Sequence, residues 1–127
     1  MFYKKLKNNI VQCVLCPHFC TLKINETGKC KVRKNINGKL ISLVYRKPCS
    51  LALDPIEKKP LYHFLPGELA LSIATFGCNL KCMHCQNYEI SQEFGNIEGK
   101  EANPEEVIEE AKKNNVKIIS YTYTEPT

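Results

Sequence analysis

Three cysteines lie within eight residues of the loop Phe76-Gly77-Cys78-Asn79-Leu80-Lys81-Cys82-Met83-His84-Cys85-Gln86-Asn87, which follows a short apolar run. Three thiols in one short loop indicate a metal site. A structural zinc site normally closes a tetrahedron with a fourth protein ligand, and no further cysteine pair follows Cys85. An iron–sulfur cluster held by three cysteines instead leaves one iron open to a ligand from outside the protein. The loop is therefore typical of a reactive cluster.

The spacing C-x3-C-x2-C, with the ring of His84 just before the third cysteine, resembles the cluster loop of the radical S-adenosylmethionine (SAM) superfamily. Two other stretches resemble one subgroup, the AmmeMemoRadiSam-system radical enzymes, which are relatives of pyruvate formate-lyase activating enzymes. These stretches are Leu53-Asp54-Pro55-Ile56-Glu57-Lys58-Lys59-Pro60-Leu61-Tyr62-His63-Phe64-Leu65-Pro66-Gly67 and Tyr121-Thr122-Tyr123-Thr124-Glu125-Pro126-Thr127. The resemblance covers most of the chain, from Cys13 to Thr127.

The resemblance implies two cofactors, a 4Fe–4S cluster on Cys78, Cys82 and Cys85, and SAM chelated to the fourth iron. It implies reductive cleavage of SAM to methionine and a 5'-deoxyadenosyl radical, with an electron donor as a partner. His84 stands where the family usually places a ring near the adenine of SAM. Glu125 stands at the end of the family's Gly-Gly-Glu stretch, which grips the methionyl amine, although other residues replace the two glycines here.

Four more cysteines, Cys13, Cys16, Cys20 and Cys30, form a second group. Four soft ligands from two loops fit a structural zinc site, and they also fit a second, fully ligated iron–sulfur cluster for electron delivery. Plain buried thiols are the third interpretation. His18 lies inside this group, and we expect it to support the ligands rather than to replace one. The lone Cys49 is expected to be a buried small apolar side chain.

Composition and charge narrow the class of protein. The net charge of +5 is spread along 127 residues without a basic stripe interleaved with aromatics, so no nucleic-acid partner is expected. No apolar run approaches the roughly 18 residues of a membrane span, so no membrane partner is expected. Residues 1–10 hold three lysines and lack the apolar core of a signal peptide. We therefore expect a cytoplasmic protein whose two groups of cysteines bind metal rather than form disulfides.

Local signals predict the order strand, cluster loop, helix, strand. Leu69–Ala74 is a continuous apolar run, typical of a strand buried on both faces of a parallel sheet. Asn103–Lys113 has a capping residue, a proline at the first helical position and a capping-box glutamate, Glu106. Val116–Tyr121 is a second β-branched strand, which completes one right-handed βαβ unit. Val107, Ile108 and Ala111 are expected to form the buried stripe of the helix.

The residues before the cluster loop give weaker signals. Residues 35–39 predict a turn ahead of a strand at Leu40–Tyr45. Four prolines predict an ordered but irregular segment over Arg46–Gly67, and the basic start over Met1–Asn9 is expected to be loosely docked.

The predicted fold class is α/β, the start of a partial βα (TIM-like) radical SAM barrel preceded by a small cysteine-rich, metal-bound β segment. We expect residues 1–67 to form that segment and residues 68–127 to form the first βαβ unit. Because two strands do not close a barrel, we expect an incomplete or split chain that works with a complementing carboxyl-terminal barrel chain. Two functions stay open: a radical SAM enzyme of the glycyl-radical-activase type, and a non-catalytic iron–sulfur or zinc-binding fragment or electron carrier.

Overall fold

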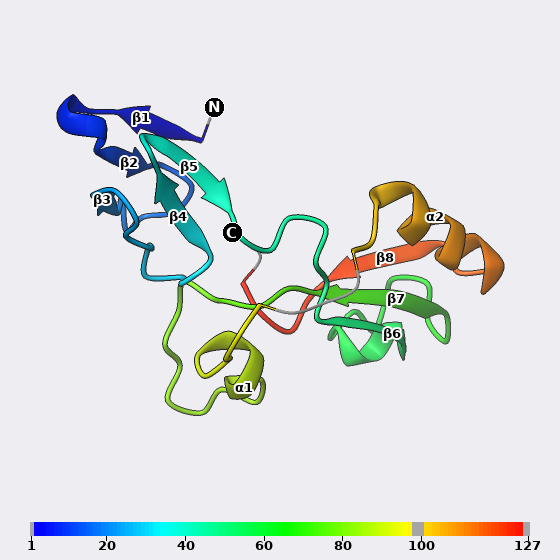
Figure 1. Ribbon diagram of the computed structural model, residues 1–127. Helices are drawn as coiled ribbons and strands as arrows, with labels where there is room; N and C mark the ends of the chain where they lie inside the picture. The colour runs from blue at the N-terminus through cyan, green and yellow to red at the C-terminus, as the bar shows by residue number, and fades with distance from the viewer. Residues whose placement is uncertain (1, 98–100, 126–127) are drawn as a thin grey trace.

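The computed structural model describes residues 2–97 and 101–125. The strands β1 to β5 form an amino-terminal lobe, and β6, β7 and β8 form a separate sheet that helix α2 accompanies (Figure 1). The short helix α1 follows the loop that leaves β7. The α/β class is confirmed, and the sheets are open rather than closed into a barrel.

The amino-terminal lobe contains two small antiparallel sheets. One has the order β1-β2-β3, and β4 and β5 form a hairpin. The bounds are β1 (Tyr3–Lys5), a 3-10 turn (Lys7–Asn9), β2 (Val11–Cys13), β3 (Thr21–Leu22), β4 (Arg33–Ile36) and β5 (Lys39–Ser42). The hairpin confirms the predicted turn. The basic start is not loose, because β1 pairs with β2 along its whole length.

A buried asparagine ties the two small sheets together. Asn35 is fully buried, and its amide donates hydrogen bonds to the carbonyl of Leu22 at 2.9 Å and to that of Asn9 at 2.8 Å. Its carbonyl oxygen accepts from the Gly38 amide in the hairpin turn. Because sheets this small bury little apolar surface, these satisfied polar contacts fix their relative position.

The third sheet has the order β6-β7-β8, with β6 (Ser50–Pro55), β7 (Leu69–Ala74) and β8 (Ile118–Tyr121). β7 has the predicted bounds and pairs in parallel with β8, which confirms the βαβ order. The irregular segment predicted over residues 46–67 was wrong in part, because β6 pairs antiparallel with β7 over six residue pairs. Proline stands only at the last position of this edge strand, where it is tolerated.

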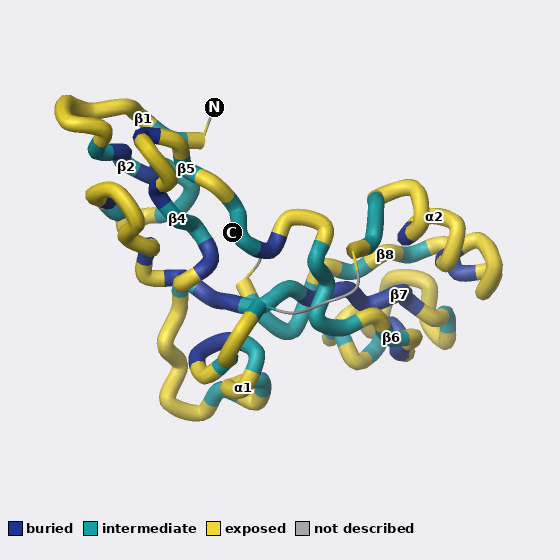
Figure 2. Tube along the Cα trace, viewed as in Figure 1, coloured by how far each residue is buried: buried dark blue, intermediate teal, exposed yellow. Residues whose placement is uncertain are grey.

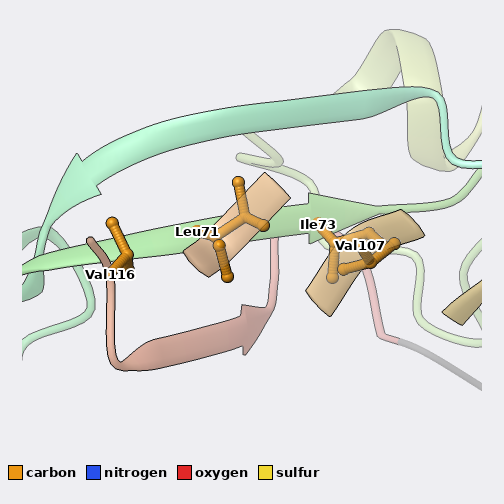
Figure 3. Close-up of a cluster of buried hydrophobic side chains, with 5 residues drawn as sticks. Leu71, Ile73, Val107 and Val116 are labelled. Atoms are coloured by element: carbon orange, nitrogen blue, oxygen red, sulfur yellow. The ribbon is translucent and has the colours of Figure 1, made fainter. Parts of the chain in front are cut away.

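Helix α2 (Pro104–Lys113) begins as predicted, with the Asn103 amide donating to the Glu106 carboxylate at 2.6 Å. Its buried residues pack on β7, and Figure 3 shows this cluster. Its members are Leu71, Ile73, Val107, Ala111 and Val116. Ile108 was wrongly included in the buried stripe, since 46% of its surface is exposed. The helix therefore uses a narrower apolar face than its sequence offers.

A second apolar cluster joins the amino-terminal lobe to the segment after β7. It consists of Cys30, Val32 and Val44, with Phe76, Phe94 and Ile97 against them. β7 itself carries a run of five buried residues, dark blue in Figure 2. The strand and this cluster therefore fix the point from which the cysteine-bearing loop departs. None of the helices in the described ranges has the length and apolar character needed to cross a membrane.

Candidate metal centre

The predicted cluster loop leaves the carboxyl end of β7 and runs without regular structure to α1 (Tyr88–Ser91). Its amide at Gly77 donates to the carbonyl of Ile90 at 2.9 Å, so the loop folds back on α1. Gly77 has a φ of +87°, and a Cβ atom there would stand 2.5 Å from the carbonyl oxygen of Cys30 and from a Val32 methyl. Only glycine fits at this entry to the loop.

The three loop thiols have different surroundings. Cys78 is buried, and its sulfur accepts a hydrogen bond from the Leu80 amide at 3.4 Å. Cys85 is half-buried, with its sulfur 3.2 Å from the hydroxyl oxygen of Ser91. Cys82 is exposed and lines an open hollow with Lys31 and Tyr88. The amide at the Cys78 sulfur and the hydroxyl beside the Cys85 sulfur suit metal-bound thiolates, because both groups can donate hydrogen bonds to such sulfurs.

All eight cysteines are free thiols. In the part of the chain that the structure describes, however, no three cysteine, histidine or acidic side chains converge as ligands on one point. The structure thus brings the predicted thiols onto one loop at one end of β7 without arranging them as a coordination sphere. As a donor set they fit a cluster, because one short loop supplies three thiols and one of them, Cys82, lines an open, solvent-accessible hollow.

The two predicted SAM-binding residues, His84 and Glu125, are both exposed. The segment just before Glu125 is anchored to both ends of the loop. The hydroxyl of Thr124 donates to the carbonyl of Thr75 at 3.0 Å, and the side-chain amide of Asn87 donates to the carbonyl of Tyr123 at 2.9 Å. Residues 123–125 therefore lie at the same end of the sheet as the cysteine loop.

Tyr123 keeps a backbone conformation that favours glycine, with a φ of +70°. It occupies one of the two positions where the resembling family has glycine. A tyrosine in the left-handed region is strained and needs support from its surroundings. Its hydroxyl donates a hydrogen bond to the Asp54 carboxylate, and the Lys59 ammonium lies 4.7 Å from the centre of its ring.

Asp54 is the centre of a buried polar network that the sequence analysis did not identify. Its carboxylate accepts from Ser72 at 2.6 Å and from Lys58 and Lys59 at 2.7 Å each. Burial raises the pKa of Asp54, but the four hydrogen bonds together outweigh burial and hold that pKa well below its usual range. The side chains of Asp54 and Lys59 are each only 7% exposed. The ionised carboxylate thus links β6, β7 and the segment after β8.

The four amino-terminal thiols line one small cavity, together with His18, Gly28 and Arg33. Their positions are Cys13 at the end of β2, Cys16 and Cys20 around the turn before β3, and Cys30 before β4. Burial raises the pKa of the Cys13 thiol, and repulsion from the other three thiols adds to that rise. Cys49 lies apart from both groups and is half-buried rather than buried, and burial raises its pKa too.

Direct contacts connect the two cysteine groups. His18 donates from Nε2 to the carbonyl oxygen of Asn79 at 2.8 Å, which places the amino-terminal turn against the cluster loop. The Lys31 ammonium donates to the carbonyl of Gln92 at 2.6 Å, just after α1. Among the described residues, two buried side-chain atoms lack a hydrogen-bond partner, Nε of Arg33 and Oδ1 of Asn79. One lies at each cysteine group.

Comparison with known proteins agrees with the resemblance at the level of the superfamily. Residues 72–127, which include Cys78, Cys82, Cys85 and Glu125, match the model of the Radical SAM superfamily. The chain is 53% identical over 128 positions to the Methanocaldococcus jannaschii protein named "Uncharacterized protein MJ0808". That alignment covers all of this chain and 38% of the relative, so the chain spans well under half of that protein's length. No solved structure gives a significant match.

Proposed function

We propose that this chain carries the cluster-binding part of a radical SAM enzyme, with Cys78, Cys82 and Cys85 as the ligands of a 4Fe–4S cluster. The supporting observation is their placement on one loop at the carboxyl end of β7, inside the range that matches the superfamily. Functional groups of βα folds gather at that end of the sheet. When bound, the reduced cluster and SAM supply an electron transfer that yields methionine and a 5'-deoxyadenosyl radical.

The surroundings of each thiol suit a different role in holding the cluster. Cys78 is fixed in the interior and takes an amide hydrogen bond, so it is the rigid anchor. Cys85 is held near the hydroxyl of Ser91, the last residue of α1. Cys82 faces solvent, next to the hollow lined by Lys81 and Tyr88. The open iron would thus be reachable by a small molecule from the side of Cys82.

Glu125 and His84 are proposed to bind SAM from the exposed side of the loop. Thr124 and Asn87 hold the segment before Glu125 beside the loop, so its carboxylate is available to the cationic amine of the methionyl group. His84 is exposed next to the third ligand, where its ring can stack on the adenine.

We assign the enzyme to the AmmeMemoRadiSam subgroup, related to glycyl-radical activases, because its two diagnostic stretches meet in space. Asp54 and Lys59 come from the first stretch, and Tyr123 comes from the second. Pro126 and Thr127 of the second stretch lie outside the described residues. An activase of this type abstracts hydrogen from a glycine of a partner protein and needs an electron donor. These partners, and a cytoplasmic location that keeps the thiols reduced, are parts of the proposal.

Further βα units are proposed to pair with β8, from a complementing carboxyl-terminal barrel segment. β8 is an edge strand of the described sheet, and Ile119 and Tyr121 on it are exposed by 37% and 69%. An exposed edge with apolar side chains favours association with another strand. The longer relative has residues beyond those aligned with this chain.

Anaerobic reconstitution with iron and sulfide tests the cluster without requiring turnover. We expect about four irons per chain at the triplet, in line with a single cubane cluster, and, after one-electron reduction with dithionite, an electron paramagnetic resonance spectrum that changes when SAM is added. Single changes Cys78→Ala, Cys82→Ala or Cys85→Ala should abolish both signals, whereas Cys49→Ala should retain them. Retention of the cluster in all three triplet variants would exclude the assignment.

Turnover separates the enzyme from a simple electron carrier. With reductant and a complementing barrel segment, we expect 5'-deoxyadenosine to form from SAM. A cluster that cycles between oxidation states but neither responds to SAM nor yields 5'-deoxyadenosine would indicate the carrier function instead.

A further inference from the structure

We propose that Cys13, Cys16, Cys20 and Cys30 bind one zinc ion and that this zinc centre braces the cysteine loop after β7. The proposal concerns a second site, separate from the thiols of that loop, and does not depend on radical chemistry. It starts from the observation that all four thiols, which come from residues 13–30, line a single cavity.

Two similar turns present these thiols. In the first, the amide of Phe19 donates to the carbonyl of Cys16 at 3.2 Å, and in the second the amide of Lys31 donates to the carbonyl of Gly28 at 2.8 Å. Both turns end in a residue with positive φ, Phe19 and Lys31. The amide of Cys13 donates to the carbonyl of Cys20 at 2.9 Å, which holds the ends of β2 and β3 together. Paired turns with cysteines are the usual frame of a tetrathiolate zinc site.

The size of the cavity favours a single ion over a cluster. Its volume is about 10 Å³, which is close to the room that one water molecule needs. A cubane of four irons and four sulfides needs far more space than that. In the structure the thiols stand around the cavity wall without converging as ligands, so binding would draw them inward onto the ion.

The charge around the cavity fits a bound anionic centre. A zinc ion with four thiolates carries a net charge of about −2. Arg33 and Lys29 line the same cavity, and Nε of Arg33 is buried without a hydrogen-bond partner among the described residues. A buried guanidinium N–H normally finds an acceptor, and a metal-bound thiolate sulfur would supply one.

The zinc site would act on the neighbouring loop through two direct contacts. His18, inside the first turn, bonds to the backbone of Asn79, and the carbonyl of Cys30 packs against Gly77. Both contacts reach residues next to Cys78. Fixing the two turns on one ion would therefore fix the start of the loop before any cluster is present.

Metal analysis of the full chain, purified without added metal, tests the proposal. We expect about one zinc per chain, which remains in the triple variant Cys78→Ala/Cys82→Ala/Cys85→Ala and in the control Cys49→Ala. The zinc should be lost in Cys16→Ala and in Cys20→Ala, two half-buried thiols. Zinc that follows the triplet, or iron in place of zinc at the amino-terminal thiols, would overturn the proposal.

Cobalt keeps the test decisive if the cysteine variants do not fold. The wild-type chain, stripped of metal and titrated with Co²⁺, should show the intense absorption of tetrahedral thiolate coordination with an endpoint of about one Co²⁺ per chain. Zinc should displace that signal stoichiometrically. Octahedral cobalt spectra, or an endpoint that requires the triplet thiols, would contradict the proposed site.

Amide hydrogen exchange at residues 78–82 tests separately whether the zinc ion stabilises the cysteine loop. Zinc binding to the triple variant, which cannot hold a cluster, should slow exchange at these amides. Unchanged exchange there would limit the zinc ion to the amino-terminal lobe and refute the bracing.

Discussion

The two cysteine groups differ in what holds them. The amino-terminal thiols sit at strand ends and in hydrogen-bonded turns, around one small cavity that is less open than the hollow beside Cys82. The triplet thiols sit on a loop without regular structure, and Met83, between two of them, is fully exposed. Closed surroundings suit an ion with all its positions filled by protein. Open surroundings suit a metal group that must accept an outside ligand.

The cysteine loop after β7 is nevertheless held in place by contacts from the amino-terminal lobe and from the β6-β7-β8 sheet. His18 and Cys30 contact it from the amino-terminal side, and Asn87 links its far end to Tyr123 and hence to Asp54 on the sheet side. A reactive loop that is preorganised by its neighbours needs no secondary structure of its own. Substituting one contact residue at a time shows how much each contact contributes to the stability of the fold and of the loop.

The largest effect is expected from Asp54→Asn. Lys59 would then keep a buried ammonium without its counter-charge, and Tyr123 would lose support for its strained backbone. We expect a loss of about 3–5 kcal/mol in the free energy of unfolding. Urea denaturation measures it, with Glu109→Gln on the exposed face of α2 as the control for the same chemical change. Equal stability of the two variants would show that the network does not support the fold.

The same variant has a defined pH signature. The folded-state pKa of Asp54 lies below that of the unfolded chain, so the ionised carboxylate stabilises the fold at every pH above about 3.9. The stability difference between wild type and Asp54→Asn should therefore be constant near neutral pH and shrink as the pH falls below about 4. A difference that shrinks instead as the pH rises would contradict the assigned ionisation.

Next in size is Gly77→Ala, which tests the contact between the two cysteine groups. The added Cβ would meet the Cys30 carbonyl and Val32 at 2.5 Å, and the former is backbone that cannot turn away. We expect a loss of about 2–4 kcal/mol, of which about 1 comes from the positive φ. Gly67→Ala is the matched control, because Gly67 has a φ of +80° and nothing within 4 Å. Similar losses for both variants would mean that the contact is soft.

Thiol reactivity should separate the groups even without metal. In reduced, metal-free protein at pH 7.5, Cys82 should react with iodoacetamide at least about tenfold faster than Cys13, which is buried and has a raised pKa. Raising the pH should narrow this gap, since more of the Cys13 thiol then ionises. Mass spectrometry of each labelled peptide measures both rates. Faster labelling of Cys13 than of Cys82 would contradict the expectation that the triplet thiols are the more accessible group.

The smallest effect is expected from His18→Ala. Its hydrogen bond to Asn79 is exposed, so we expect a loss of less than about 1 kcal/mol in global stability. Hydrogen exchange at the loop amides should nevertheless accelerate, while zinc content stays unchanged. His63→Ala, another exposed histidine, is the control. Unchanged exchange in His18→Ala would remove this contact from the supports of the loop.

Strong local signals made part of the fold predictable. The apolar run at β7 and the capping box of α2 were located correctly, and the parallel pairing of β7 with β8 followed from the βαβ order. β6 was missed because its flanking prolines suggested an irregular segment, whereas its pairing with β7 is decided by contacts outside its own sequence. β1 was missed for a similar reason. Its basic residues gave no strand pattern, and its pairing with β2 forms the strand.

The sequence offered a list of candidate ligands but not their arrangement. Short spacing singled out both cysteine groups, because metal ligands recur at short intervals, and their roles as ligands stay predictions. The contacts that join them, such as His18 to Asn79, connect residues 61 positions apart and leave no local pattern. Asp54 was quoted only as part of a resembling stretch, since its partners Ser72 and Tyr123 lie on other strands and segments. The orientation of the triplet thiols around a metal stays a prediction.

The mixed pairing of β7 also favours one order of folding. β6 and β7 are joined by the short segment 56–68, whereas β8 reaches β7 only across residues 75–117. Closing the shorter loop costs less chain entropy, so the antiparallel pair can form early and offer β7 as a template. During synthesis the amino-terminal lobe, β6 and β7 are all made before β8 leaves the ribosome. The cysteine loop would then acquire its amino-terminal supports first, and its contact with Tyr123 would come last.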